Sequence, residues 1–335
     1  MQLHHRLIFF LLIGVSCSSL AAEPDIFAAN KALGRGVNLG NALEAPKEGD
    51  WGIKLEESFF PQIKGAGFSH VRLPTKWSAH AGTDAPYTIE QAFFERVDWV
   101  LDQAEKHGLA VVLNVHHYDE MDSDPDAHLP RLVALWRQIA ARYRDRPASL
   151  YFELLNEPHG KLNDEGKWNA CIPPVLAAVR ESNKTRPVII GGAWWNGIWA
   201  VPKLKLPDDP NLIVTVHCYD PFEFTHQGAS WAKGSDKWLG RTWTGSEAEL
   251  KKLRDTFDIA AKYGHDHKRP IYLGEFGAYE KADLASRVAW TRAMTRAAEA
   301  RGFSWAYWEF CAGFGVYDRS AAAFRPELLS ALLAK

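Results

Sequence analysis

Short apolar runs alternate with amphipathic helical patterns along most of this chain. Eight of the runs have the length and composition of strands that are buried on both faces. They span residues 36–39, 69–73, 110–115, 150–156, 188–190, 212–216, 271–274 and 304–308. Apolar residues recur at helical spacing over 55–66, 89–107, 129–143, 167–182, 247–263, 284–301 and 326–333. Each strand is therefore followed by a predicted helix, except the fifth, whose link to the sixth carries no clear helical pattern.

Eight alternations of strand and helix predict an α/β protein that folds as a single (β/α)8, or TIM, barrel. The alternative is a doubly wound open sheet, which usually carries a glycine-rich phosphate-binding turn between its first strand and first helix. The glycines of Gly34-Arg-Gly-Val-Asn-Leu-Gly40 belong to the stretch that forms the first strand and do not open a helix, so this signature is weak here. The barrel is therefore the favoured fold.

Length and charge limit the classes of partner. The chain has 335 residues, 47% of them hydrophobic, and a formal net charge of −2. This length suits one large domain or two smaller ones, and the absence of a Ser/Gly/Pro-rich linker favours one. A nearly neutral chain gives no reason to expect nucleic acid or an anionic surface as a partner. We expect a monomer without a nucleic-acid partner.

The first residues have the pattern of an export signal. A weakly basic start precedes an apolar run over 7–15, which is too short to span a bilayer, and small residues follow at 19–22. We therefore expect residues 1–22 to be a signal peptide and residues 23–335 to be the folded domain, either secreted or periplasmic. The alternative is an outer-membrane lipoprotein with a lipid on Cys17. Gly14 disfavours it, because an apolar residue is usual three positions before a lipidated cysteine.

Polar or aromatic side chains collect at the carboxyl ends of the predicted strands, where a barrel places its active site. In chain order they are Asn38, Arg72, His116, Asn156, Glu157, His217, Tyr219, Glu275 and Trp308. Glu157 and Glu275 each end an apolar run, where a carboxylate is costly unless it has a partner or a function. If they face each other across the barrel mouth, they form the pair of carboxylates that cleavage of a glycosidic bond requires.

The histidines also allow a metal site, formed by His116, His117 and His217. Strand alternation argues against it, because successive side chains point to opposite faces. Asn114 and His116 share a face, so His116 should point into the barrel and His117 toward a helix. We therefore expect no metal ion, and no motif indicates another cofactor.

Seven stretches at these strand ends resemble glycoside hydrolase family 5, which contains many bacterial endoglucanases. They are Val37-Asn-Leu-Gly-Asn41, Val71-Arg-Leu-Pro74, Asn114-Val-His-His-Tyr118, Asn156-Glu-Pro158, His217-Cys-Tyr219, Gly274-Glu-Phe-Gly277 and Tyr307-Trp308. Each stretch is weak alone, but all seven occur in order over nearly the whole chain, and the combination is specific. Residues 23–335 would then form a glycoside hydrolase catalytic domain. The resemblance also implies a cis peptide bond between Trp308 and Glu309.

The resemblance implies a retaining double displacement without a cofactor, in which Glu157 is the acid/base and Glu275 the nucleophile. Glu275 must stay ionised, so a cation and hydrogen-bond donors should surround it, and Arg72 and Tyr219 are the candidates. His217 is a candidate for orienting Tyr219 or Glu275.

Further contacts follow from the same resemblance. Asn156 would hydrogen-bond the sugar 2-hydroxyl, and Trp308 would form the floor of the subsite at the bond that is cut. Glu153, four residues before Glu157, should point into the barrel, where an ion pair with Arg72 is its simplest role.

Tryptophan is abundant at the predicted mouth. Nine of the 14 tryptophans fall in loops or at strand ends there: Trp51, Trp77, Trp194, Trp195, Trp199, Trp231, Trp238, Trp243 and Trp308. Sugar rings stack on aromatic faces, although loop packing is the alternative for each of these side chains. Trp194 and Trp195, at the end of the fifth strand, are the first candidates for sugar platforms.

We predict a secreted endo-β-1,4-glucanase, or cellulase, that acts on β-glucan polysaccharides or oligosaccharides. A β-mannanase or a xyloglucanase would use the same machinery, and the sequence leaves this choice open. A non-catalytic carbohydrate-binding barrel is a further alternative, but such a protein has no use for two facing carboxylates.

Overall fold

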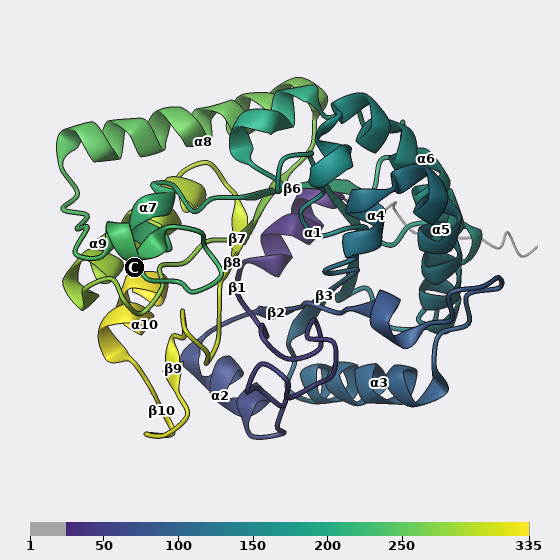
Figure 1. The fold of residues 1–335 in the computed structure, drawn as a ribbon, viewed down its shortest axis with the longest axis horizontal. Helices are drawn as coiled ribbons and strands as arrows, with labels where there is room; N and C mark the ends of the chain where they lie inside the picture. Colours follow the sequence, from purple (N-terminus) through teal and green to yellow (C-terminus); the bar gives the residue numbers. More distant parts are fainter. Residues whose placement is uncertain (1–24, 335) are drawn as a thin grey trace, which may run out of the picture.

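The computed structural model describes residues 25–334 and shows a closed barrel of eight parallel strands surrounded by helices (Figure 1). Neighbouring strands pair in chain order, and the first also pairs with the eighth, which closes the barrel. The predicted (β/α)8 fold is confirmed. The expected signal peptide and Cys17 lie outside the described residues. Between residues 25 and 334, no helix has the length and apolar character that a membrane crossing needs.

All eight predicted strands are present and end within three residues of their predicted bounds. They are β1 (Arg35–Asn38), β2 (His70–Leu73), β3 (Ala110–Asn114), β4 (Leu150–Glu153), β5 (Val188–Gly191), β6 (Leu212–His217), β7 (Ile271–Glu275) and β8 (Ser304–Tyr307). The covering helices are α2 (Phe59–Ala66), α3 (Gln91–Lys106), α5 (Pro125–Arg142), α6 (Glu165–Ser182), α8 (Glu247–His267), α9 (Leu284–Glu299) and α10 (Pro326–Leu333).

Shorter elements complete the connections. They are η1 (Trp77–His80), α4 (Asp119–Ser123), η2 (Gly160–Asn163), η3 (Ile198–Lys203), α7 (Phe222–Thr225), η4 (Ser235–Trp238) and the hairpin of β9 (Tyr317–Asp318) with β10 (Ala323–Phe324). Only the 3-10 helix η3 links β5 to β6, as the missing helical pattern predicted.

Helix α2 begins at Phe59 rather than at residue 55, because other groups hold the backbone of Leu55. The Leu55 N–H donates to Glu48 Oε1 at 2.8 Å, and the Leu55 carbonyl accepts from Arg96 Nη2 at 2.7 Å. These two hydrogen bonds keep Leu55 in the loop. Helices α5 and α8 each extend about one turn beyond their predicted bounds.

Helix α1 (Ile26–Leu33) was not predicted, and it closes the N-terminal end of the barrel. Asp25 caps it by accepting a hydrogen bond from the Phe27 N–H at 2.9 Å. Ile26 and Leu33 pack on the apolar side chains inside this end, which are Val112, Tyr151, Ile189, Ile213, Tyr272 and Ala306. In Figure 1, α1 lies in the middle of the ring of strands. With this end plugged, the carboxyl ends of the strands are left to form a site.

Candidate active site

Arg72, on β2, is the centre of a buried polar network at the carboxyl end of the barrel. Its guanidinium donates to both oxygens of Glu153, at 2.6 and 3.0 Å, and to Glu275 Oε1 at 2.7 Å. It also donates to the Oδ1 atoms of Asn38, at 2.8 Å, and Asn156, at 2.6 Å. Arg72 and Glu153 have no exposed surface, so the predicted buried ion pair is confirmed. One guanidinium on β2 thus aligns groups from β1, β4 and β7 and from the segment just after β4.

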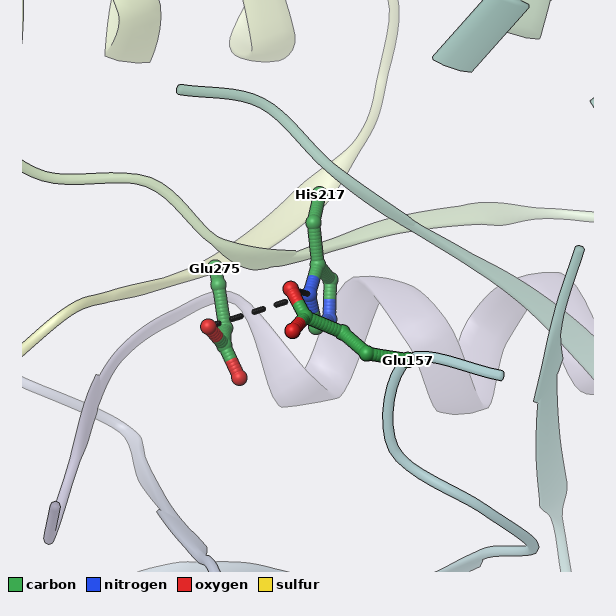
Figure 2. Close-up of side chains that lie close together, drawn as sticks. All are labelled: Glu157, His217 and Glu275. Carbon is green, nitrogen blue, oxygen red and sulfur yellow. Dashed lines mark hydrogen bonds and ion pairs between the residues drawn. The ribbon is translucent and has the colours of Figure 1, made fainter. Parts of the chain in front are cut away.

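Glu157 and Glu275 face each other at the barrel mouth (Figure 2). Glu275 is the last residue of β7, whereas Glu157 lies beyond β4 with a φ of 47°. One carboxylate oxygen of each, together with a ring nitrogen of His217, lies within 4.8 Å of the others. This spacing is close to the separation of about 5–5.5 Å between the carboxyl groups of retaining glycosidases.

Glu275 is held by one cation and one hydroxyl donor. Arg72 donates to its Oε1, and the Tyr219 hydroxyl donates to its Oε2 at 2.8 Å. Burial and the nearby charge of Glu157 raise the pKa of Glu275, whereas the positive charge of Arg72 and the hydrogen bond from Tyr219 lower it. Burial and the charge of Glu275 raise the pKa of Tyr219 well above its usual value, so Tyr219 remains a donor. These contacts favour the ionised form of Glu275.

No cation contacts Glu157 among the described residues, and burial raises its pKa to about 7. Its nearest polar partner is Nδ1 of His217, which lies 2.8 Å from Oε1. Burial lowers the pKa of His217 to about 4, so this imidazole is neutral near pH 7. The side chain of Glu157 is 23% exposed, against 6% for that of Glu275. Glu157 can therefore hold a proton and present it to the mouth.

His217 lies within ion-pair range of Glu275, one of its two expected partners, but its closest partner is Glu157, which was not expected. Its Nδ1 lies 2.8 Å from Glu157 Oε1 and 3.7 Å from Glu275 Oε2, so Glu157 is its main contact. Strand alternation could not indicate this contact, because Glu157 lies beyond β4 in a left-handed backbone conformation.

His116 lies at the mouth as predicted, but the prediction that His117 points to a helix is wrong. His116 stacks nearly parallel to Trp308, with ring centroids 6.0 Å apart. Asn114 Nδ2 lies 3.0 Å from its Nδ1, and burial lowers the pKa of His116 well below its usual value, so the neutral ring keeps an Nε2–H donor. The His117 ring packs against His116 and against Trp51, at 4.5 and 5.6 Å. β3 ends at Asn114 and His117 has a φ of 48°, so strand alternation does not extend to His117.

Comparison with known families identifies the chain. The family model described as cellulase, glycosyl hydrolase family 5, matches residues 31–313. The chain belongs to glycosyl hydrolase family 5. This confirms both the family and the enzyme class, glycoside hydrolase, that the sequence motifs predicted.

Relatives of this family 5 chain include endoglucanases. Endoglucanase H of Acetivibrio thermocellus is 37% identical over 321 residues, which cover 94% of this chain but only 34% of that protein. The chain thus spans about a third of that relative's length. Two crystal structures of Cel5A from Thermotoga maritima, one with mannotriose and one with cellobiose, are each 54% identical. They cover 92% of this chain and 100% of their own, with TM-scores of 0.90 and 0.91.

The aromatic side chains of the family 5 site differ in exposure. Trp195 is 47% exposed, and its ring stacks on that of His159, with centroids 5.1 Å apart. Trp194 is half-buried and packs against the core, so Trp195 is the better candidate platform of the two. Trp77 and Trp243, which we placed at the mouth, are buried and serve packing.

Two further buried glutamates at the mouth were missed. Glu44 follows β1 and accepts from two backbone N–H groups, and Glu309 follows β8 and accepts from three. Burial raises the pKa of Glu44 to about 8 and that of Glu309 to about 7. Glu309 follows Trp308 directly, so its place at a strand end could have indicated it. The Trp308–Glu309 bond is cis, as the resemblance implied.

A metal ion would need a different set of ligands from the one we considered. Within residues 25–334, the cluster with suitable ligand spacing is Glu157, His217 and Glu275. Arg72 already donates to Glu275, and its positive charge would oppose a cation at this point. The three groups are therefore better suited to acid/base and nucleophilic chemistry than to metal binding.

Proposed function

We propose that this chain is an endo-β-1,4-glucanase that hydrolyses β-glucans with net retention, with Glu275 as nucleophile and Glu157 as acid/base. The observation that carries the proposal is the pair of carboxylates within 4.8 Å, one held by donors and the other able to keep a proton. The names of the relatives, several of which are endoglucanases, support the activity.

In the first step, a carboxylate oxygen of Glu275 attacks the anomeric carbon while Glu157 donates its proton to the leaving glycosidic oxygen. The bond to the leaving sugar breaks, and a glycosyl ester forms on Glu275. In the second step, Glu157 takes a proton from water, which attacks the same carbon and releases Glu275. Two inversions at this carbon give net retention.

The pKa of Glu157 fits both steps. Burial raises it to about 7, so below that pH the carboxyl is protonated and can act as an acid. Ester formation then removes the negative charge of Glu275. The loss of this neighbouring charge lowers the pKa of Glu157, and the residue can act as a base in the second step.

The remaining side chains would bind the sugar. Arg72 occupies Oδ1 of Asn156 and leaves its Nδ2 as a donor for the sugar 2-hydroxyl. His116 offers its Nε2–H, and Trp308, stacked on it, offers a ring face as a floor. Trp195 offers an exposed face beside the loop of Glu157 and would bind a sugar further along the chain.

β-Mannanase activity is the second candidate, and one observation favours it. Cel5A of Thermotoga maritima, 54% identical to this chain, has been crystallised with mannotriose described as its substrate. The groups around the scissile bond are the same for either sugar, so the choice depends on loops away from the two glutamates. We also propose that the enzyme is exported, on the basis of the signal pattern over 1–22, and that it acts as a monomer.

Two measurements test the proposal. Reducing-sugar release is compared on carboxymethyl cellulose, mixed-linkage glucan, glucomannan, mannan, xyloglucan and xylan, and we expect the β-1,4-glucans to be cleaved. Proton NMR during the first minutes of cello-oligosaccharide hydrolysis should show the β-anomer forming first. Activity on none of the glucans would refute the substrate, and an initial α-anomer would refute retention.

A further inference from the structure

Glu157 has an unusual backbone conformation for a side chain that must be placed accurately. Its φ is 47°, in the left-handed region that residues other than glycine rarely adopt. It also precedes Pro158, and the residue before a proline avoids helical conformations for steric reasons. Contacts from the surroundings must therefore hold the peptide groups on both sides of Glu157.

Asn196, on the loop after β5, makes one of these contacts. With its amide oriented to satisfy both neighbours, Oδ1 accepts from the Glu157 N–H at 3.3 Å and Nδ2 donates to the Gly192 carbonyl at 2.8 Å. On the other side of the residue, His159 Nδ1 donates to the Glu157 carbonyl at 2.8 Å. The N–H and the C=O of Glu157 are thus each held by a side chain.

Asn196 is buried, and neighbouring groups fix its position. It is 1% exposed, and its own carbonyl accepts from the backbone N–H of His217 at 2.9 Å. Because His217 also contacts the Glu157 carboxyl, Asn196 fixes both the backbone of Glu157 and the nearest partner of its side chain. Gly191 leaves room for the amide, since a Cβ there would lie 2.2 Å from a terminal atom of the Asn196 side chain.

We propose that Asn196 is a positioning residue for Glu157, and that its amide sets the direction in which Glu157 delivers its proton to the leaving oxygen. The inference rests on the proposed role of Glu157 as acid/base. Asn196 contacts the Glu157 backbone and not the reacting atoms, so its effect is confined to steps that need the proton of Glu157.

The test is Asn196→Gly, because Asn196 has a φ of 55° and glycine removes the amide while tolerating this conformation. Phenyl cellobioside needs a proton on its leaving group, whereas dinitrophenyl cellobioside does not. We expect kcat/KM for the phenyl substrate to fall about 10- to 100-fold, as for a misplaced catalytic group. We expect kcat/KM for the dinitrophenyl substrate to stay within about threefold, because its first step needs no acid.

Two further variants distinguish an error in the role of Glu157 from an error in the role of Asn196. Asn163→Gly is the matched control, because Asn163 Oδ1 accepts from the Trp194 N–H and supports the same loop without touching Glu157. It should affect both substrates equally. Glu157→Gln is the reference for a lost acid, and it should show the largest difference between the two substrates. If Glu157→Gln lowers kcat/KM equally for the two substrates, the proposed role of Glu157 is wrong. If Glu157→Gln affects the phenyl substrate more and Asn196→Gly affects both equally, only the inference about Asn196 is wrong.

Gly191→Ala is a second variant that should disturb the Asn196 amide without changing Asn196 itself. Its methyl group would displace the Asn196 side chain, so it should reproduce the defect that depends on the leaving group. In the Asn196→Gly background, the methyl group has room, and Gly191→Ala should add no further loss. Additive losses in this double variant, or an equal loss on both substrates in the single variants, would overturn the inference.

Discussion

Glu157 and Glu275 are chemically identical side chains in two different settings. Glu275 is the last residue of β7, and Arg72 and Tyr219 hold its two oxygens at 2.7 and 2.8 Å. Glu157 lies on a loop with a φ of 47°, and the closest group to its carboxyl is the neutral imidazole of His217. The rigid, donor-rich setting suits a nucleophile that must carry charge, and the cation-free setting suits a group that must gain and lose a proton.

The largest effect is expected from removing the nucleophile. Glu275→Gln should lower turnover on glucans by several orders of magnitude, because the covalent step is lost, while circular dichroism and substrate binding remain as in the wild type. Glu280→Gln, on the exposed loop after the same strand, is the matched control and should keep full activity. A Glu275→Gln enzyme with more than about one per cent of wild-type turnover would contradict the assignment.

Arg72 connects the network to the nucleophile, and its loss should affect stability. Arg72→Met leaves Glu153 and Glu275 buried without their cation, so the free energy of unfolding should fall by about 3–5 kcal/mol in urea titrations. Arg137→Met breaks an ion pair with Glu181 that is about half exposed, and it should cost less than about 1 kcal/mol. Similar losses for both variants would show that the buried network is not needed to hold the site.

The pH profile should report the raised pKa of Glu157. The acid form is active, so kcat/KM for phenyl cellobioside should fall as the pH rises through about 7. For dinitrophenyl cellobioside, kcat/KM should not fall in this range, because its first step needs no proton donor. A fall for both substrates at the same pH would assign this ionisation to another group.

A variant of Tyr219 measures the contribution of one hydrogen bond to Glu275. Tyr219→Phe removes one hydrogen bond to a charged group, worth about 1.5–3 kcal/mol, so kcat/KM should drop about tenfold to hundredfold. Because Tyr219 lowers the pKa of Glu275, the acidic limb of the pH profile should move to higher pH in the variant. Tyr263→Phe, which removes a hydrogen bond to the Leu204 carbonyl on the outside of the barrel, should leave this limb unchanged.

The sequence alone was enough to predict the barrel and most of the side chains at its mouth. Strands buried on both faces appear as apolar runs, and a glutamate at the end of such a run stands out because of its burial cost. Arg72 was predicted from its place at a strand end and Glu153 from alternation along its strand, and both predictions are correct because the two residues lie within β2 and β4. The pattern worked wherever the backbone repeats every two residues.

Features that depend on irregular backbone could not be predicted in this way. His117, Glu157 and Asn196 all have positive φ, and alternation gives no direction for a side chain in that conformation. Asn196 also has no motif of its own, and its role depends on a neighbour 39 positions earlier in the chain.

Trapping of the covalent intermediate tests the division of roles most directly. Dinitrophenyl 2-deoxy-2-fluoro-cellobioside has a good leaving group, while its fluorine slows hydrolysis of the ester, so the intermediate should accumulate. Peptide mass spectrometry of the inactivated enzyme then locates the sugar, with Glu275→Gln as the unlabelled control. We predict an ester on Glu275, in the segment that begins at β7. An ester on Glu157, or inactivation without any ester, would contradict the account.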